Sequence, residues 1–259
     1  MENLEFEIIR KYRHKLYVSQ INDNGEIELC RQFVVELMTG MAQLSRRYFE
    51  NMSRKYCQGG LCRFPYTYHE RQLESIIVPT LSKMCNGMVI TELPIDRKVV
   101  IDYEKEYFPG HADFWCIYQG FTFIIEVKHS YDNLKTDVTR TDTVLDRWNR
   151  MIEQLNSIDQ DIKKICQENT KGIIRLGLHF ITSYADPNAA DENTIREYRR
   201  NIENTLLRIE QDLEQGHRRS LKPDFMACWE IPTAMAEYCD FGIYPGLVVA
   251  VKVLRTLKK

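Results

Sequence analysis

Residues 110–128, which read GHADFWCIYQGFTFIIEVK, are the most informative part of this chain. The pair Gln119-Gly120 suits a two-residue hairpin turn, because glycine tolerates the positive φ that such a turn needs. With this turn, the numbers of opposed residues add up to 239, which sets Asp113 directly across from Glu126. Lys128 follows two residues later and shares the face of Glu126, because side chains alternate along a strand.

Both faces of this predicted hairpin are largely apolar. One face is expected to be core throughout and carries Ala112, Phe114, Cys116, Tyr118, Phe121, Phe123, Ile125 and Val127. The face of Asp113 also holds Trp115, Ile117 and Ile124. The charged residues therefore form a polar cluster at the rim of a buried sheet.

Two carboxylates that face each other across a sheet repel. A cation between them removes the repulsion, and paired carboxylate oxygens suit Mg²⁺ or Mn²⁺, which bind hard oxygen ligands and retain waters. A nearby lysine can position a water or offset charge on a phosphate in the transition state. These are the parts of metal-assisted phosphodiester hydrolysis. The plain alternative is a rim hairpin in which Lys128 forms salt bridges to one or both acids.

The spacing of Asp113 and Glu126-Val127-Lys128 resembles the PD-(D/E)XK nuclease superfamily, which includes restriction endonucleases, Holliday junction resolvases and repair nucleases. The order of elements over about residues 68–183 is similar as well. Ala112 stands where the name of the superfamily shows proline, a position that varies in the group. The resemblance implies an α/β fold with a restriction-endonuclease-like mixed β-sheet flanked by helices.

The resemblance also implies roles for the residues of the motif. Asp113 and Glu126 would ligate Mg²⁺ or Mn²⁺ together with the backbone carbonyl of Val127. Lys128 would orient the attacking water and stabilise the transition state.

Members of the superfamily often carry a glutamate on the preceding helix. Glu70 is the preferred candidate because it lies near the expected helix start. Glu74 is the second candidate, since it lies four residues later on the same helix face. A solvated helix glutamate is the alternative for either residue.

Further polar residues surround the motif in sequence. Four basic residues follow the hairpin and are expected to contact phosphates, namely Lys135, Arg140, Arg147 and Arg150. The resemblance implies a Gln or basic residue on the following helix, for which Gln154 is a candidate. His111 shares the face of Asp113 and either lies near the metal or caps the hairpin. The alternative for each basic residue is an ordinary exposed helix face.

The Gly59-Gly60 pair and Pro65 break the helical pattern and mark a boundary. We therefore expect an N-terminal strand and helix extension, residues 1–62, and an α/β domain, residues 63–259, which the resemblance implies is nuclease-like. The expected helices cover residues 28–56, 69–85, 142–168 and 191–215, and Pro79 predicts a kink or an early end in the second of them. The expected strands cover short segments within 1–27 around a turn at 22–25, then 87–93, 98–103, 112–118, 121–128, 173–183, 225–231 and 247–254.

Composition limits the possible classes of protein. The 259 residues include 35 Lys and Arg against 37 Asp and Glu, so any nucleic acid must meet a local basic surface rather than a polycation. No stretch is long and apolar enough to span a membrane, and the acidic N-terminus lacks the features of a signal peptide. The 8 scattered cysteines fit reduced thiols, so we expect a cytoplasmic protein.

Three functions remain open at this level. The first is a metal-dependent nuclease, with DNA as the expected substrate by analogy and a homodimer or partner protein as a possible assembly. The second is a non-catalytic nucleic-acid- or protein-binding module on the same fold. The third is a metal-dependent hydrolase of a small phosphorylated substrate. The sequence shows no Walker A loop, dinucleotide glycine fingerprint or nucleophile elbow.

Overall fold

The computed structural model describes residues 5–21, 23, 25–55, 64–101, 104–134, 141–158, 170–186, 192–215, 222–237 and 242–254. Its strands form one mixed sheet of eight strands in the order β1-β2-β7-β8-β6-β5-β4-β3. The strands are β1 (Phe6–Lys11), β2 (His14–Ser19), β3 (Val89–Ile101), β4 (Glu104–Tyr118), β5 (Phe121–Asn133), β6 (Ile173–Ala185), β7 (Phe225–Glu230) and β8 (Ile243–Leu254). The helices are α1 (Glu26–Lys55), η1 (Pro65–Thr67, a 3₁₀ turn), α2 (Glu70–Met84), α3 (Thr141–Ser157), α4 (Glu192–Arg200), α5 (Ile202–Gln215) and α6 (Thr233–Ala236).

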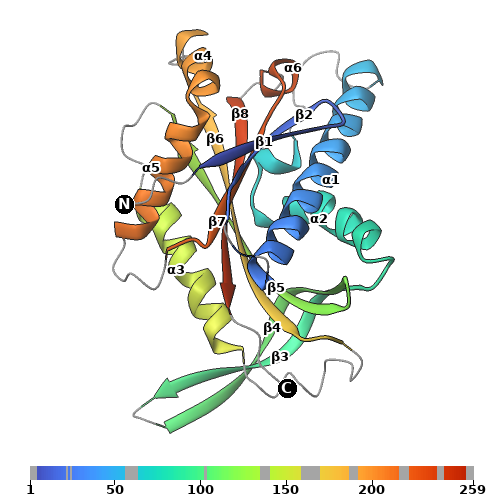
Figure 1. Ribbon diagram of the computed structural model, residues 1–259, viewed down its shortest axis with the longest axis vertical. Coiled ribbons are helices and arrows are strands. Elements are labelled where there is room, and N and C mark those ends of the chain that lie inside the picture. Colours follow the sequence, from blue (N-terminus) through green and yellow to red (C-terminus); the bar gives the residue numbers. More distant parts are fainter. Residues whose placement is uncertain are drawn as a thin grey trace.

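Helices cover both faces of this sheet, so the expected α/β class with a mixed sheet flanked by helices is confirmed. Figure 1 shows α1 and α2 on one side, and α3, α4 and α5 on the other. The core under α1 and α2 includes Phe33, whose ring stacks on Phe123 of β5 at 4.6 Å between centroids. The core under α3 and α5 includes Trp148 and Leu206, both fully buried.

The sheet joins segments that are far apart in the sequence. β5 and β6 pair in parallel, whereas the other neighbouring strands pair antiparallel. β2 pairs with β7, more than 200 residues later, so the first two strands belong to the same sheet as the strands beyond residue 63. β3 and β4 continue past the edge of β5 as a two-stranded projection at the lower left of Figure 1.

The β4–β5 hairpin has the register predicted from its turn. Gln119 and Gly120 both have positive φ, 48° and 83°, and Tyr118 pairs with Phe121. The paired ladder ends at Phe114 and Ile125, one pair before the two carboxylates. The strands part there, which opens a space between them for polar side chains.

Because the strands part here, Ala112 lies on the other face of the sheet from the one predicted. Ala112 was expected beside Phe114 in the core under α1 and α2. Instead it packs with Trp115 and Ile124 in the core under α3, because the regular ladder does not extend to it.

The N-terminal turn lies elsewhere than predicted. β1 and β2 turn at Tyr12 and Arg13, whose φ angles are 52° and 66°, and not at the expected 22–25, of which Asn22 and Asn24 lie outside the described residues. Turn-forming residues also suit helix starts. Here the Gly25 amide donates to the Asp23 carboxylate, and the Gly25 carbonyl accepts the first hydrogen bond of α1 from Leu29.

Of the two effects predicted at Pro79, a kink or an early end, the early end does not occur, because α2 continues to Met84. The carbonyl that loses its partner belongs to Ser75, which is exposed and can bind water instead.

The helix predicted over 142–168 ends at Ser157. Ile158 already forms a bridge to Arg97 of β3, so the helix cannot continue through it. Two arginines satisfy carbonyls of the last turn: Arg97 donates to Gln154 and Arg175 donates to Leu155. Residues 159–169 lie outside the described part of the chain.

The helix predicted over 191–215 is two helices separated at Asn201, a poor helix former. Four cysteines, Cys30, Cys85, Cys116 and Cys228, are buried free thiols, as the sequence predicted. In the described residues no helix is both long and apolar enough to cross a membrane.

Candidate active site

Lys128 is the centre of a polar cluster where β4 and β5 part. Its side chain is 9% exposed, and its ammonium group lies 3.3 Å from Glu70 Oε1 and 3.9 Å from Asp113 Oδ2. It also donates to the carbonyl of Val127 at 2.8 Å. The first residue of α2, the end of the β4 ladder and β5 therefore bring three of the expected catalytic side chains together.

Asp113 is fixed by the backbone of the opposite strand. The amide of Val127 donates to Asp113 Oδ2 at 2.6 Å, so the carboxylate takes the place of a strand carbonyl where the ladder ends. One carboxylate oxygen thus faces both a backbone amide and the ammonium group of Lys128. Both contacts favour the ionised form of Asp113.

Glu126 is completely buried and has one partner. Its Oε1 accepts a hydrogen bond from Arg97 Nη2 at 2.7 Å. Its Oε2 has no hydrogen-bond partner. A buried carboxylate oxygen without a partner is costly, and it is a candidate position for an ion.

Burial makes both central carboxylates hard to ionise. Desolvation, then repulsion by Asp113, raises the pKa of Glu126 to about 7, although Arg97 acts in the opposite direction. Desolvation also raises the pKa of Asp113, against the lowering effects of Lys128 and the Val127 amide. A further positive charge between these carboxylates would lower both pKa values.

Arg97 of β3 is part of this site and was not found from the sequence. Pro94 interrupts the apolar pattern of residues 87–103, so the sequence predicts two short strands, whereas β3 is continuous. Arg97 also donates to the carbonyl of His111 and to Ser157 Oγ. Gly110 leaves room for its side chain, because an added Cβ would lie 2.8 Å from Arg97 Cδ.

Of the two candidate glutamates on α2, the structure favours Glu70. Glu70 contacts Lys128, whereas Glu74 has no such contact. Glu74 is nevertheless close enough to Asp113 and Glu92 for their charges, after desolvation, to raise its pKa. Glu92 of β3 adds further negative charge beside Asp113, and the sequence analysis did not identify it.

The oxygen atoms that this cluster offers as ligands suit a hard divalent cation. They are carboxylate oxygens, and one of them lacks a partner. Asp113 and Glu126 would hold such an ion. Among the described residues, no three His, Cys, Asp or Glu side chains converge closely enough to form a metal site by themselves. The carbonyl of Val127, which the resemblance implies as a further ligand, here accepts a hydrogen bond from Lys128.

A cavity of about 400 Å³ adjoins the cluster at Glu70. Arg147 of α3 lines it, together with His69, His129, Ser130, Tyr131, Asn133, Thr143 and Tyr184. Of the expected basic residues, Arg147 therefore lines the same cavity as Glu70 of the cluster.

The other expected supporting residues differ in their positions. Arg150 is exposed and pairs with Asp146 on its own helix, at 3.0 Å. Gln154 accepts from Arg97 through its backbone carbonyl, while its side-chain oxygen is buried without a partner. His111 is exposed, and its carbonyl also accepts from Arg97. Lys135 and Arg140, the other two residues expected to contact phosphates, lie outside the described residues.

No family model matches this sequence, and no curated protein matches it. Among solved structures, the chain is similar to one titled "Crystal structure of SSO0001", with 12% sequence identity and a TM-score of 0.22. That match covers 70% of this chain and 75% of the other.

Proposed function

We propose that this protein is a metal-dependent nuclease of the PD-(D/E)XK type, with a restriction-endonuclease-like fold, that hydrolyses phosphodiester bonds, with DNA as the expected substrate. The observation that carries the proposal is the contact of Lys128 with Glu70 and Asp113, beside the unpartnered Oε2 of buried Glu126. Four residues with these functional groups come from α2, β4 and β5 and meet at one rim of the sheet.

Each residue of the cluster has a distinct task in this reaction. Asp113 and Glu126 would hold Mg²⁺ or Mn²⁺, which would supply Lewis-acid stabilisation of a phosphoryl oxygen and a more acidic water. The ammonium group of Lys128 stabilises negative charge that develops on the phosphate. Glu70 accepts a hydrogen bond from Lys128 and so orients it. Arg147, in the adjoining cavity, binds a neighbouring phosphate of the substrate strand.

Arg97 favours a second candidate, a non-catalytic nucleic-acid- or protein-binding module on the same fold. Its guanidinium group already neutralises Glu126 at 2.7 Å. Lys128 likewise donates a hydrogen bond to the carbonyl of Val127, which the resemblance implies as a metal ligand. In this alternative the two internal cations replace the metal, and the cluster stabilises the parted strands.

The test is a cleavage assay with supercoiled, linear and single-stranded DNA and with RNA, each in Mg²⁺, in Mn²⁺ and in EDTA. The isosteric variants are Lys128→Met and Asp113→Asn, and the matched control is Asp146→Asn on the exposed face of α3. Titration calorimetry with Mn²⁺ gives a second readout that does not depend on turnover.

A nuclease requires metal-dependent cleavage by the wild type and by Asp146→Asn, and loss of cleavage in the other two variants. Asp113→Asn should also weaken Mn²⁺ binding, whereas Lys128→Met should retain it. Absence of both cleavage and Mn²⁺ binding in the wild type contradicts the nuclease and favours the binding module.

A further inference from the structure

A second hollow, of about 410 Å³, lies away from the carboxylate cluster. Three segments form it: the β1–β2 turn, the middle of α1 and the last turns of α2. Its residues are Lys11, Tyr12, Glu36, Thr39, Gly40, Gln43, Leu44, Arg47, Pro79, Thr80, Lys83 and Met84. Glu70 and Lys83 lie thirteen residues apart on α2, so about 20 Å of helix separates this hollow from the proposed active site.

The close crossing of two helices forms the floor of the hollow. Gly40 of α1 packs directly against Thr80 of α2, and a methyl group on Gly40 would collide with the Thr80 side chain. The hydroxyl groups of Thr39 and Thr80 donate to carbonyls of their own helices, at 2.7 and 2.6 Å. The hydrogen-bond donors available to a ligand are therefore the longer side chains at the mouth.

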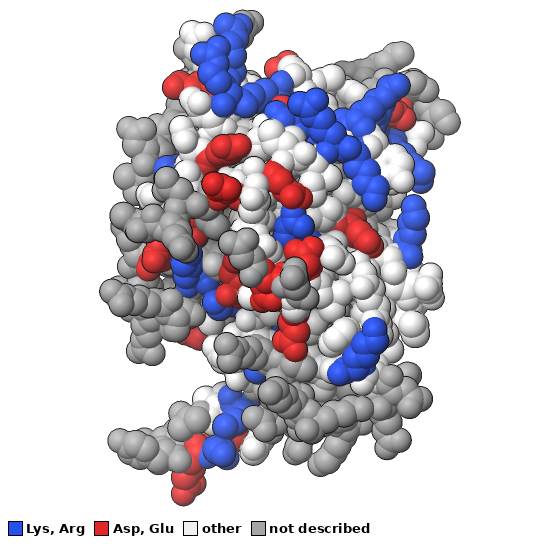
Figure 2. Space-filling view, viewed as in Figure 1, with Lys and Arg blue, Asp and Glu red and all other residues white. Residues whose placement is uncertain are grey.

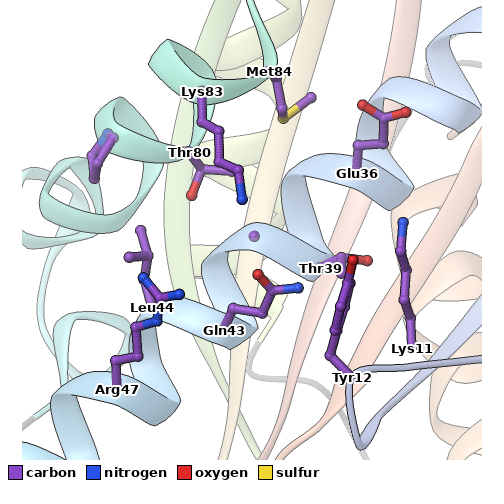
Figure 3. A pocket seen from close by; sticks show the side chains of 12 residues that line it. Lys11, Tyr12, Glu36, Thr39, Gln43, Leu44, Arg47, Thr80, Lys83 and Met84 are labelled. Carbon is purple, nitrogen blue, oxygen red and sulfur yellow. The ribbon is translucent and has the colours of Figure 1, made fainter.

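Those longer side chains are mostly cationic. Figure 3 shows Lys83, Gln43 and Arg47 reaching toward the same space between α1 and α2. Within the described part of the chain, neither Lys83 nor Arg47 has a carboxylate at ion-pairing distance. Glu36 lies to one side in Figure 3, with its carboxylate directed away from these three groups.

The described residues that line the hollow carry a net positive charge. Three cations face one carboxylate, and Lys and Arg side chains also predominate in the upper right of Figure 2, over the region of α1 and the β1–β2 turn. Two ammonium or guanidinium groups and an amide around one space match the charge and the acceptor oxygens of a phosphate group.

Tyr12 extends the recognition beyond a bare phosphate. It is 64% exposed, and the turn with positive φ at Tyr12 and Arg13 fixes its backbone at the mouth. Lys11 Nζ lies over one face of its ring, 5.6 Å from the centroid, and the exposed ring offers its other face for a nucleobase to stack on. A hollow of about 410 Å³ is also large enough for one nucleotide rather than an inorganic ion alone.

We propose that this hollow is a second binding site that takes the phosphate of a nucleotide on Lys83, Arg47 and Gln43 and its base on Tyr12. The phosphate can come from a free nucleotide or from the backbone of a nucleic-acid strand. This site does not require the protein to be a nuclease, since it shares no residue with the carboxylate cluster.

The test measures binding in EDTA, so that cleavage does not contribute. The probes are ADP, followed by calorimetry, and a labelled single strand of fifteen thymidines, followed by fluorescence anisotropy. The variants are the pair Lys83→Gln/Arg47→Gln and the isosteric single change Gln43→Glu, which adds a negative charge to the same space. The control is Lys98→Gln/Lys105→Gln, which removes two charges from the projecting β3–β4 hairpin.

We expect the control to bind like the wild type and the pair Lys83→Gln/Arg47→Gln to bind at least about tenfold more weakly, because each charge-assisted hydrogen bond contributes about a factor of ten or more. Gln43→Glu should weaken binding similarly without lowering thermal stability. A loss restricted to ADP assigns a free nucleotide, and a loss restricted to the oligonucleotide assigns a strand backbone. Failure of the wild type to bind either probe, or equal affinity of the wild type and the Lys83/Arg47 variant for both, overturns the proposal.

Discussion

Replacing Glu126 by glutamine should stabilise the protein at alkaline pH. The carboxyl group is completely buried, and desolvation together with Asp113 raises its pKa to about 7. Because the pKa is higher in the folded than in the unfolded chain, the group imposes no penalty at low pH, and the penalty grows as the pH rises toward and through about 7. Glutamine keeps the shape and cannot ionise, so Glu126→Gln removes this penalty.

The size of the effect follows from the two pKa values. A carboxyl group that changes from about 4.5 to about 7 on folding costs about 1 kcal/mol at pH 5 and about 3 kcal/mol at pH 8.5. Urea unfolding in EDTA at both pH values measures the difference between the wild type and Glu126→Gln. The control is Glu153→Gln, an exposed position on α3, where no change is expected.

The dependence on pH is the decisive result. A free-energy difference that stays constant between pH 5 and 8.5, or that favours the wild type more strongly at pH 8.5, would refute the argument from burial. Addition of Mg²⁺ at pH 8.5 should reduce the difference, since a ligand that binds only the folded wild type stabilises it by mass action. No reduction would count against metal binding by Glu126.

Three further changes test other parts of the structure. Gly110→Ala should lower the free energy of unfolding by about 1–3 kcal/mol, because the new methyl group displaces Arg97; a change below this range in a urea titration would contradict the close approach. Arg208→Met should lower the free energy of unfolding by about 3–5 kcal/mol, because it leaves completely buried Asp132 without the guanidinium group that lies 2.5 Å away. An unchanged unfolding midpoint would mean that Asp132 is not charged in the folded protein. Arg97→Met should raise the pKa of Glu126 above about 7. NMR of the Glu126 carboxyl group should then show protonation at a higher pH than in the wild type. An unchanged titration would exclude the ion pair.

Local rules predicted the centre of the site but not all of its residues. Gln119-Gly120 and strand alternation were sufficient to bring Asp113, Glu126 and Lys128 into one region, because a two-residue turn fixes register over short distances. Arg97 was not predicted, because Pro94 interrupts the apolar pattern and so hides from the sequence that β3 is one continuous strand. Its partner on β5 lies 29 residues away, and no periodic pattern connects the two.

The ends of the helices also depend on contacts that the local sequence pattern does not reveal. The apolar pattern correctly predicted α1 and α2 but extended α3 past Ser157, because the pattern contains no information about Arg97 and Arg175, which satisfy the carbonyls of its last turn. The N-terminal turn was misplaced because the residues at 22–25 are suited equally to a turn and to a helix start.

Local signals in the amino-acid sequence were enough to predict the β4–β5 hairpin, the amphipathic helices and the alternation that buries the hairpin faces. The tertiary structure alone decided the order of the strands, the pairing of β2 with β7, and the meeting of Arg97 with Glu126. It also decided that Lys11 and Tyr12 face Lys83 across α1. The physical reason is that turn geometry and side-chain alternation act between near neighbours, whereas these contacts follow from packing the whole sheet and both helix layers around two cores.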